Sequence, residues 1–142
     1  MASWLEGDAR REAIIYSHGP DVWRNLKLSL EQEVAAYIRI YGEDGKEAIR
    51  YTDCRPISED CFRVSFPTPL RKPDTSFEIR FSLEEKRIAC LDINVKFTLA
   101  VENDNVILQD KDGNTVSIED ASRAILSPLF AKLPHRKPNI TL

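Results

Sequence analysis

A chain of 142 residues can enclose one hydrophobic core, and its 42% apolar and 30% charged residues are typical of a globular domain. The formal net charge of −3, with acids and bases interspersed, lacks the basic footprint of a nucleic-acid-binding protein. No apolar run is long enough to cross a membrane, and the N-terminus lacks the apolar segment of a signal peptide. We therefore expect a cytoplasmic protein without a nucleic-acid or membrane partner.

The three cysteines, Cys54, Cys61 and Cys90, are an odd number and form no CxxC pair. This pattern indicates neither a disulfide framework nor a zinc site, which agrees with a cytoplasmic location. We expect no metal and no cofactor.

The N-terminal stretch predicts a helix that ends near Tyr16. Ser3 and Glu6 have the spacing of a capping box. The apolar residues that follow share one helical stripe, made by Leu5, Ala9, Ala13 and Tyr16. Ser17–Pro20 is expected to break the helix.

A second helix is predicted to begin at Pro20, because proline suits the first turn of a helix. Its buried stripe would consist of Val22, Leu26, Leu30 and Val34. Because leucines alternate over 26–30, a strand that starts here is the alternative. We favour the helix because it places Glu31–Glu33 on a helical surface.

The first hairpin is predicted around Asp44-Gly45, a sequence that suits a two-residue turn. The flanking strands would be Ala36–Tyr41 and Glu47–Thr52, with Ile40 opposite Ile49 and Ile38 opposite Tyr51. Cys61–Phe66 is the next predicted strand. Three prolines then make Pro67–Thr75 an extended loop rather than a strand.

The longest alternation covers Arg87–Val101, where every odd position from Ala89 onward is apolar. It predicts a single long strand, bent near Asn94. The preceding strand, Phe77–Phe81, would join it through a three-residue loop, Glu84–Lys86. That register places Phe81 opposite Ala89, Ile79 opposite Leu91 and Phe77 opposite Ile93.

Two further hairpins and a helix are predicted to complete the chain. A turn at Glu102–Asn105 would set Val101 opposite Val106 and Leu99 opposite Leu108. A turn at Lys111–Gly113 would set Leu108 opposite Val116 and Val106 opposite Ile118, with Gly113 in the left-handed region. The closing helix would start at Ser117–Asp120 and kink or restart at Pro128. Its apolar side is formed by Ile118, Ala121, Ile125, Leu129 and Leu133.

These elements predict an α+β fold: a single curved antiparallel sheet of about six to eight strands, covered on one face by the N-terminal and C-terminal helices. The domain would cover residues 1–133, followed by a flexible tail at 134–142.

Residues with catalytic or metal-binding chemistry are few and scattered. Asp110–Asn114 resembles the start of an EF-hand calcium loop, but Thr115 replaces the turn glycine and Ala121 replaces the closing glutamate, so a polar hairpin turn is favoured. His18 and His135 lie in breaks near the termini. Asp53 and Cys54 end a strand with no histidine nearby in the sequence.

Three functions are compatible with this sequence. The favoured function is a non-catalytic protein-interaction module, such as an adaptor, chaperone-like or inhibitor domain. Its protein partner would contact the proline-flanked residues Pro69, Leu70, Arg71 and Lys72. A homodimer is a separate possibility, in which an exposed edge of the sheet pairs with that of a second copy.

The alternative is a small apolar-ligand binding protein, with a pocket between sheet and helices that is lined by Phe62, Phe66, Phe77, Phe81 and Phe97. The third is a small enzyme that uses His18 or the Asp53/Cys54 strand end.

Overall fold

The computed structural model describes residues 4–41, 50–53, 60–66 and 75–131, together with Pro138 and Ile140. In chain order, the elements are α1 (Trp4–Tyr41), β1 (Arg50–Asp53), β2 (Cys61–Phe66), β3 (Thr75–Ser82), β4 (Arg87–Cys90), the short 3₁₀ turn η1 (Leu91–Ile93), β5 (Val95–Glu102), β6 (Asn105–Gln109), β7 (Thr115–Val116) and α2 (Ile118–Ala131).

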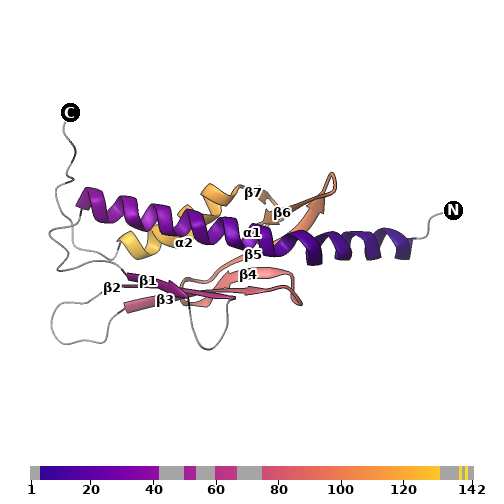
Figure 1. Ribbon diagram of the computed structural model, residues 1–142, viewed down its shortest axis with the longest axis horizontal. Coiled ribbons are helices and arrows are strands. Elements are labelled where there is room, and N and C mark those ends of the chain that lie inside the picture. The colour runs from indigo at the N-terminus through magenta and orange to yellow at the C-terminus, as the bar shows by residue number, and fades with distance from the viewer. Residues whose placement is uncertain are drawn as a thin grey trace.

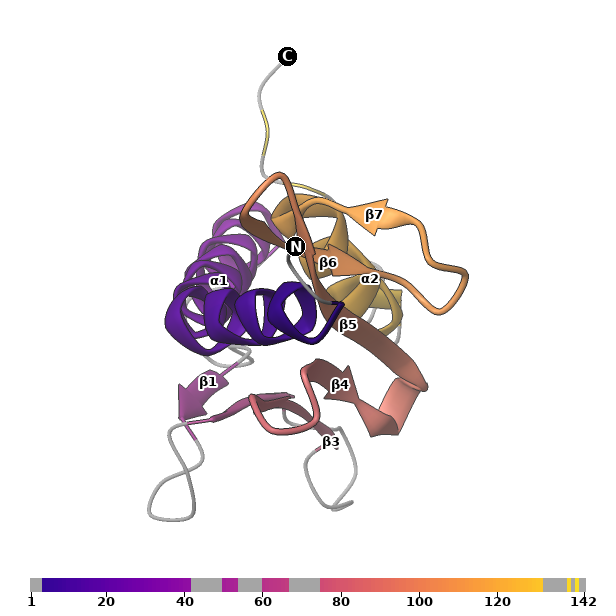
Figure 2. The ribbon, with the colours of Figure 1, turned by 90° about the vertical axis from the view of Figure 1, so that its right-hand side faces the viewer.

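The seven strands form one antiparallel sheet in which each strand pairs with its neighbours in the sequence. Figure 1 shows α1 and α2 on the same side of this sheet. In the end-on view of Figure 2, the sheet curls from β1 beneath α1 round to β7 beside α2. The predicted α+β fold, a single curved antiparallel sheet with an N-terminal and a C-terminal helix, is confirmed.

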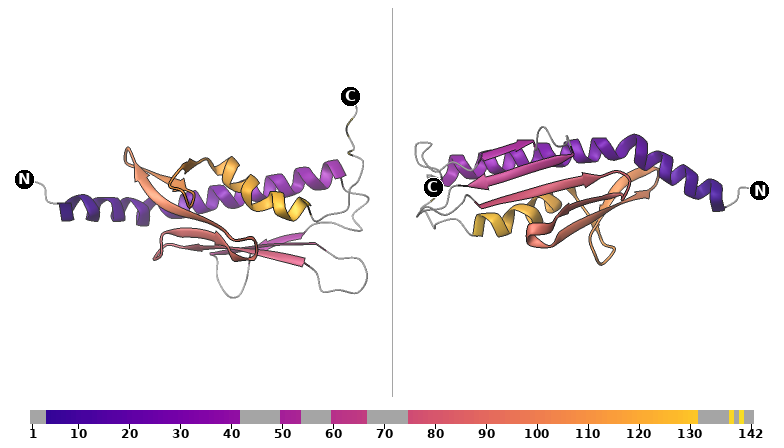
Figure 3. Two further views of the ribbon diagram at one scale, coloured as in Figure 1. Left: turned by 180° about the vertical axis from the view of Figure 1, so that it is seen from behind. Right: turned by 90° about the horizontal axis from the view of Figure 1, so that it is seen from below.

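Helix α1 is continuous for 38 residues, so the predicted break at Ser17–Pro20 is wrong. Proline has no N–H to donate to the carbonyl four residues earlier, a loss that normally bends or breaks a helix. Here the flanking residues Ile15, Gly19 and Trp23 form one buried row along the helix. Burial of this row on the sheet outweighs the missing hydrogen bond, and Figure 3 shows the axis of α1 bending along its N-terminal half.

Gly19 lets α1 approach the sheet closely. A Cβ atom at this position would lie 3.1 Å from Cδ1 of Leu83 and 3.5 Å from Cδ1 of Leu99. The first turns of α1 project beyond the sheet (Figure 1), so Trp4 and Leu5 are exposed. Tyr16, which we predicted on the buried stripe, is also exposed, whereas its neighbour Ile15 is buried.

The C-terminal end of α1 replaces the strand predicted at Ala36–Tyr41, and the pairings predicted for Ile38 and Ile40 are therefore wrong. Tyr37 stacks on Phe130 of α2 with 4.3 Å between ring centroids. This contact between the two helices favours helical geometry where the local sequence alternates like a strand. The hairpin turn predicted at Asp44-Gly45 lies outside the described residues.

The core lies between the helices and the inner face of the sheet. Trp23 of α1 stacks on Phe81 of β3, with 5.6 Å between centroids. Strand β2 contributes Phe62 and Val64, as its alternation predicted. From α2 come Ala121, Ile125 and Leu129, and this helix continues through Pro128 to Ala131.

The predicted long strand Arg87–Val101 is in fact two antiparallel strands, β4 and β5. Asn94 adopts the left-handed conformation (φ 54°) and its N–H bonds to the carbonyl of Leu91, so the chain reverses within 91–94. Cys90 consequently lies opposite Val95, and Ile88 lies opposite Phe97. Asn94 marks a reversal, not the bend that we expected.

The two faces of β4 are exchanged relative to the prediction. The loop between β3 and β4 has four residues, Leu83–Lys86, so Phe81 pairs with Ile88 and Arg80 pairs with Ala89. Ile88 and Cys90 face the core, whereas Leu91, which we expected on the inner face, is 75% exposed. Ala89, also expected on the inner face, lies on the outer face opposite Arg80, but it is only 6% exposed.

The later hairpins largely follow the predicted registers. Val101 lies opposite Val106 and Leu99 lies opposite Leu108, joined through Asn103 and Asp104, which both have positive φ. Leu108 lies opposite Val116, and Gly113 has the predicted left-handed conformation. Ile118 does not pair with Val106, because it begins α2, where the Ser117 hydroxyl accepts the N–H of Asp120 at 3.0 Å.

Cys61 is buried and disulfide-bonded, which contradicts the expectation that the cysteines form no disulfide. Cys90 is free and buried on the inner face. Cys54 and most of the predicted flexible tail, 134–142, lie outside the described residues.

The helical assignment of the Leu26–Leu30 stretch predicts unequal effects of two leucine substitutions. Leu26 is fully buried, whereas Leu28 is 53% exposed. Leu26→Ala should lower the free energy of unfolding by about 2–5 kcal/mol in urea denaturation, because it leaves a core cavity. Leu28→Ala should change it by less than about 0.5 kcal/mol. Equal losses would contradict the helical geometry.

The exchanged faces of β4 give a second test by the same measurement. Ile88 is fully buried and Leu91 is 75% exposed. Ile88→Ala should destabilise the protein by about 2–5 kcal/mol, and Leu91→Ala should be close to neutral. A larger loss of stability for Leu91→Ala than for Ile88→Ala would instead indicate the continuous strand that the alternation predicts.

Candidate functional site

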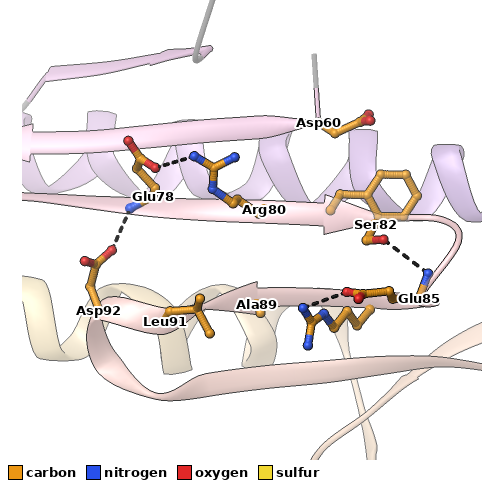
Figure 4. Close-up of a pocket in the computed structure, with 10 residues that line it drawn as sticks. Asp60, Glu78, Arg80, Ser82, Glu85, Ala89, Leu91 and Asp92 are labelled. Carbon is orange, nitrogen blue, oxygen red and sulfur yellow. Dashed lines mark hydrogen bonds and ion pairs between the residues drawn. The ribbon is translucent and has the colours of Figure 1, made fainter. Parts of the chain in front are cut away.

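A hollow lies on the outer face of the sheet, over β3 and β4. Its volume is about 440 Å³. Because Phe77, Ile79 and Phe81 face the core, the residues between them point outward, and Figure 4 shows them along one wall. The lining residues are Asp60, Glu78, Arg80, Phe81, Ser82, Glu85, Arg87, Ala89, Leu91 and Asp92.

The hollow exists because its floor is an alanine. Ala89 lies opposite Arg80 in the ladder between β3 and β4. Its neighbours on the same strand face, Arg87 and Leu91, are much larger, so the methyl group of Ala89 leaves space between them. Leu91 stands at the rim as an exposed apolar side chain.

Glu78 joins the charged residues of one wall. Its Oε1 lies 2.6 Å from a guanidinium nitrogen of Arg63, and its Oε2 lies 2.8 Å from one of Arg80. Arg63 is the cross-strand partner of Glu78, a position from which opposite charges attract. The hydrogen bonds from Arg63, and then those from Arg80, lower the pKa of the Glu78 carboxyl.

Asp92 binds the backbone of β3 beside this group. The ladder between β3 and β4 covers Arg80–Ser82, so the Glu78 N–H lies beyond its end. Asp92 Oδ2 accepts that N–H at 3.1 Å, as Figure 4 shows. The carboxylate therefore replaces a strand carbonyl and caps this part of the β3 edge.

The opposite end of the hollow is fixed by the loop between β3 and β4. The Ser82 hydroxyl accepts the N–H of Glu85 at 3.1 Å, and Glu85 forms an ion pair with Arg87 at 2.6 Å. The lining residues include four carboxylates and two guanidinium groups, and Arg63, which pairs with Glu78 from outside the lining, adds a third guanidinium, so the formal charge of this group is −1 when all are ionised. The surface thus combines an apolar floor with a negative rim.

Cys90 lies one residue from the floor but points to the core. Burial raises the pKa of its thiol to about 11, and the nearby charge of Asp92 acts in the same direction. The thiol is protonated at neutral pH, whereas the reactive form of cysteine is the thiolate. Its position favours a packing role.

The structure gathers most of the phenylalanines predicted to line a ligand pocket. Phe62, Phe77, Phe81 and Phe97 are all buried in one core cluster with Trp23. The side chain of Phe66 is not described. Their assignment to a ligand pocket stays a prediction.

The other predicted site residues are not brought together with them. Pro69, Leu70, Arg71 and Lys72 lie outside the described residues, as do Cys54 and His135; Asp53 belongs to β1, but its side chain is not described. His18 is exposed on α1, with its Nδ1 4.0 Å from Asp21 Oδ2.

The EF-hand-like stretch Asp110–Asn114 forms the polar turn that we favoured. Asp110 Oδ1 accepts the N–H groups of Asp112 and Asn114, both at 2.9 Å. Within the part of the chain that the structure describes, no three His, Cys, Asp or Glu residues are arranged to hold a metal ion.

The residues of the hollow carry no distinctive pattern in the sequence. The alternation of Phe77–Phe81 already placed Glu78 and Arg80 on the outer face, but charged outer residues are common on half-exposed sheets. Asp92 and Ala89 gave no signal, because their positions depend on the reversal after Cys90.

Comparisons with family models, with curated proteins and with solved structures give no match to this chain. Among the described residues, no helix is both long and apolar enough to span a membrane.

The Glu78 ion pairs predict a defined pH dependence of stability. Because its folded pKa lies below the ordinary value of about 4.3, Glu78 stabilises the fold above that pH, and the contribution disappears as the pH falls through the lowered folded pKa. Replacing Glu78 by Gln should lower the stability at pH 7 by at most about 1 kcal/mol, and native and variant should converge in acid.

Urea denaturation between pH 2 and 7 measures this difference, with Glu102→Gln, on an exposed part of β5, as the matched control. A deficit of the Glu78→Gln variant that grows as the pH falls would contradict the assignment.

Proposed function

We propose that this protein is a non-catalytic protein-interaction module that binds an extended segment of a partner protein in the hollow over Ala89. The observation that carries the proposal is the composition of the hollow: an alanine floor, an exposed leucine at the rim and ordered arginines along the walls. Protein interfaces likewise combine an apolar centre with a polar rim, and arginine is enriched among the residues that contribute most binding energy.

The order of the walls supports binding without large rearrangement. Glu78 holds Arg63 and Arg80 by two hydrogen bonds, and Glu85 holds Arg87. A side chain that is already fixed loses less conformational entropy when a partner binds. The lining residues are spread along β3 and β4, an arrangement that suits an extended chain more than a compact small molecule.

The same contacts give less support to the other functions. The phenylalanines proposed to line an apolar ligand pocket pack against each other and against Trp23, so a ligand there would have to displace core contacts. For an enzyme that uses His18, the exposed imidazole lies on α1 with its Nδ1 4.0 Å from Asp21 Oδ2, away from the hollow. The alternative residue Cys54 lies outside the described residues.

Selection from a library of random twelve-residue peptides tests this function. Peptides that bind the native protein should converge on related sequences and bind an Ala89→Leu variant at least about tenfold more weakly, because leucine fills the hollow without changing its charge. A Leu28→Glu variant, altered on an exposed face of α1, should bind as the native protein does. Failure to converge, or binding that is equal in the Ala89→Leu variant, would overturn the proposal.

A further inference from the structure

We infer that the segment bound in the hollow is basic, and that it places a lysine or arginine against Asp92. This inference rests on the proposed function and adds the chemical class of the partner. It is carried by the arrangement of charge around the hollow together with the apolar surface between the charges.

The positive charges of the walls are already engaged. Arg80 donates to Glu78 at 2.8 Å, and Arg87 pairs with Glu85 at 2.6 Å. An acidic ligand would have to compete with these carboxylates for the same guanidinium groups, and the lining together with Arg63, which pairs with Glu78, carries a formal charge of −1. The lining therefore disfavours an acidic partner.

Asp92 differs from the carboxylates of these pairs, because its contact is with a neutral group. Asp92 Oδ2 accepts the N–H of Glu78 at 3.1 Å. This hydrogen bond fixes the Asp92 side chain but does not neutralise its negative charge. A carboxylate held in place at the rim of a hollow is a ready acceptor for a cationic side chain.

The surface beside Asp92 fits the rest of such a side chain. Figure 4 shows Leu91 between Ala89 and Asp92, so apolar surface leads along the hollow toward the carboxylate. Lysine and arginine bury their aliphatic stems on apolar surface while the charged group remains at a polar rim. The stem would lie along the exposed side chain of Leu91, and the cationic group would reach Asp92.

Binding of three labelled octapeptides, measured by fluorescence anisotropy, tests this inference. The peptides alternate alanine with lysine, with glutamate or with serine. The lysine peptide should bind native protein at least about tenfold more tightly than the other two, and the affinity should fall as salt is raised. Asp92→Asn should weaken it about tenfold while retaining an oxygen that can accept the Glu78 N–H. Ala89→Leu should abolish binding.

Glu102→Gln removes the same charge elsewhere on the sheet and should leave the affinity of the lysine peptide unchanged. Equal weakening by Asp92→Asn and Glu102→Gln would show a general charge effect and overturn the inference. Tighter binding of the glutamate or serine peptide, lost in the Ala89→Leu variant, would overturn the basic partner but retain the hollow as an interaction site. Absence of binding by all three would overturn the inference, and the peptide selection would then decide the proposed function separately.

Discussion

The chain reversal between Cys90 and Val95 determines which side chains of β4 lie on the inner face and which lie on the outer face of the sheet. The left-handed conformation of Asn94 closes the turn, and the four residues of the loop shift the alternation from even to odd positions. On the inner side, this shift places Ile88 opposite Phe97 in the core. On the outer side, it leaves Ala89 as the floor of a hollow and carries Asp92 to the Glu78 amide, so one local constraint builds both the core packing and the candidate site.

Much of the fold could be predicted from the sequence, because in most helices and strands the spacing of apolar residues alone shows which face is buried. The β5–β6 register follows from Val101 and Leu99 and from a turn whose residues tolerate positive φ. Helix α1 was divided incorrectly because Pro20 is a strong local break signal. Its effect is overridden by the packing of Ile15 and Trp23 in the core and by the space that Gly19 leaves for Leu83 and Leu99, which no local pattern records.

The candidate site could not be predicted, since it consists of ordinary residues in a particular arrangement. In Arg87–Val101, a perfect alternation of odd apolar positions hides a hairpin, because the loop residues Leu91 and Ile93 are themselves apolar. With the faces exchanged, Leu91 changes from a predicted core residue to an exposed rim residue. The charged residues around it come together only because β3 and β4 pair.

The most direct test of this account is a nuclear Overhauser measurement on isotope-labelled protein in solution. Hairpin geometry predicts strong contacts between backbone protons of Ile88 and Phe97, and between those of Cys90 and Val95. It also predicts a contact between the Glu78 amide proton and the Asp92 side chain. Absence of these contacts, together with a backbone contact between Ile79 and Leu91, would show one continuous strand and would remove the structural basis of the hollow.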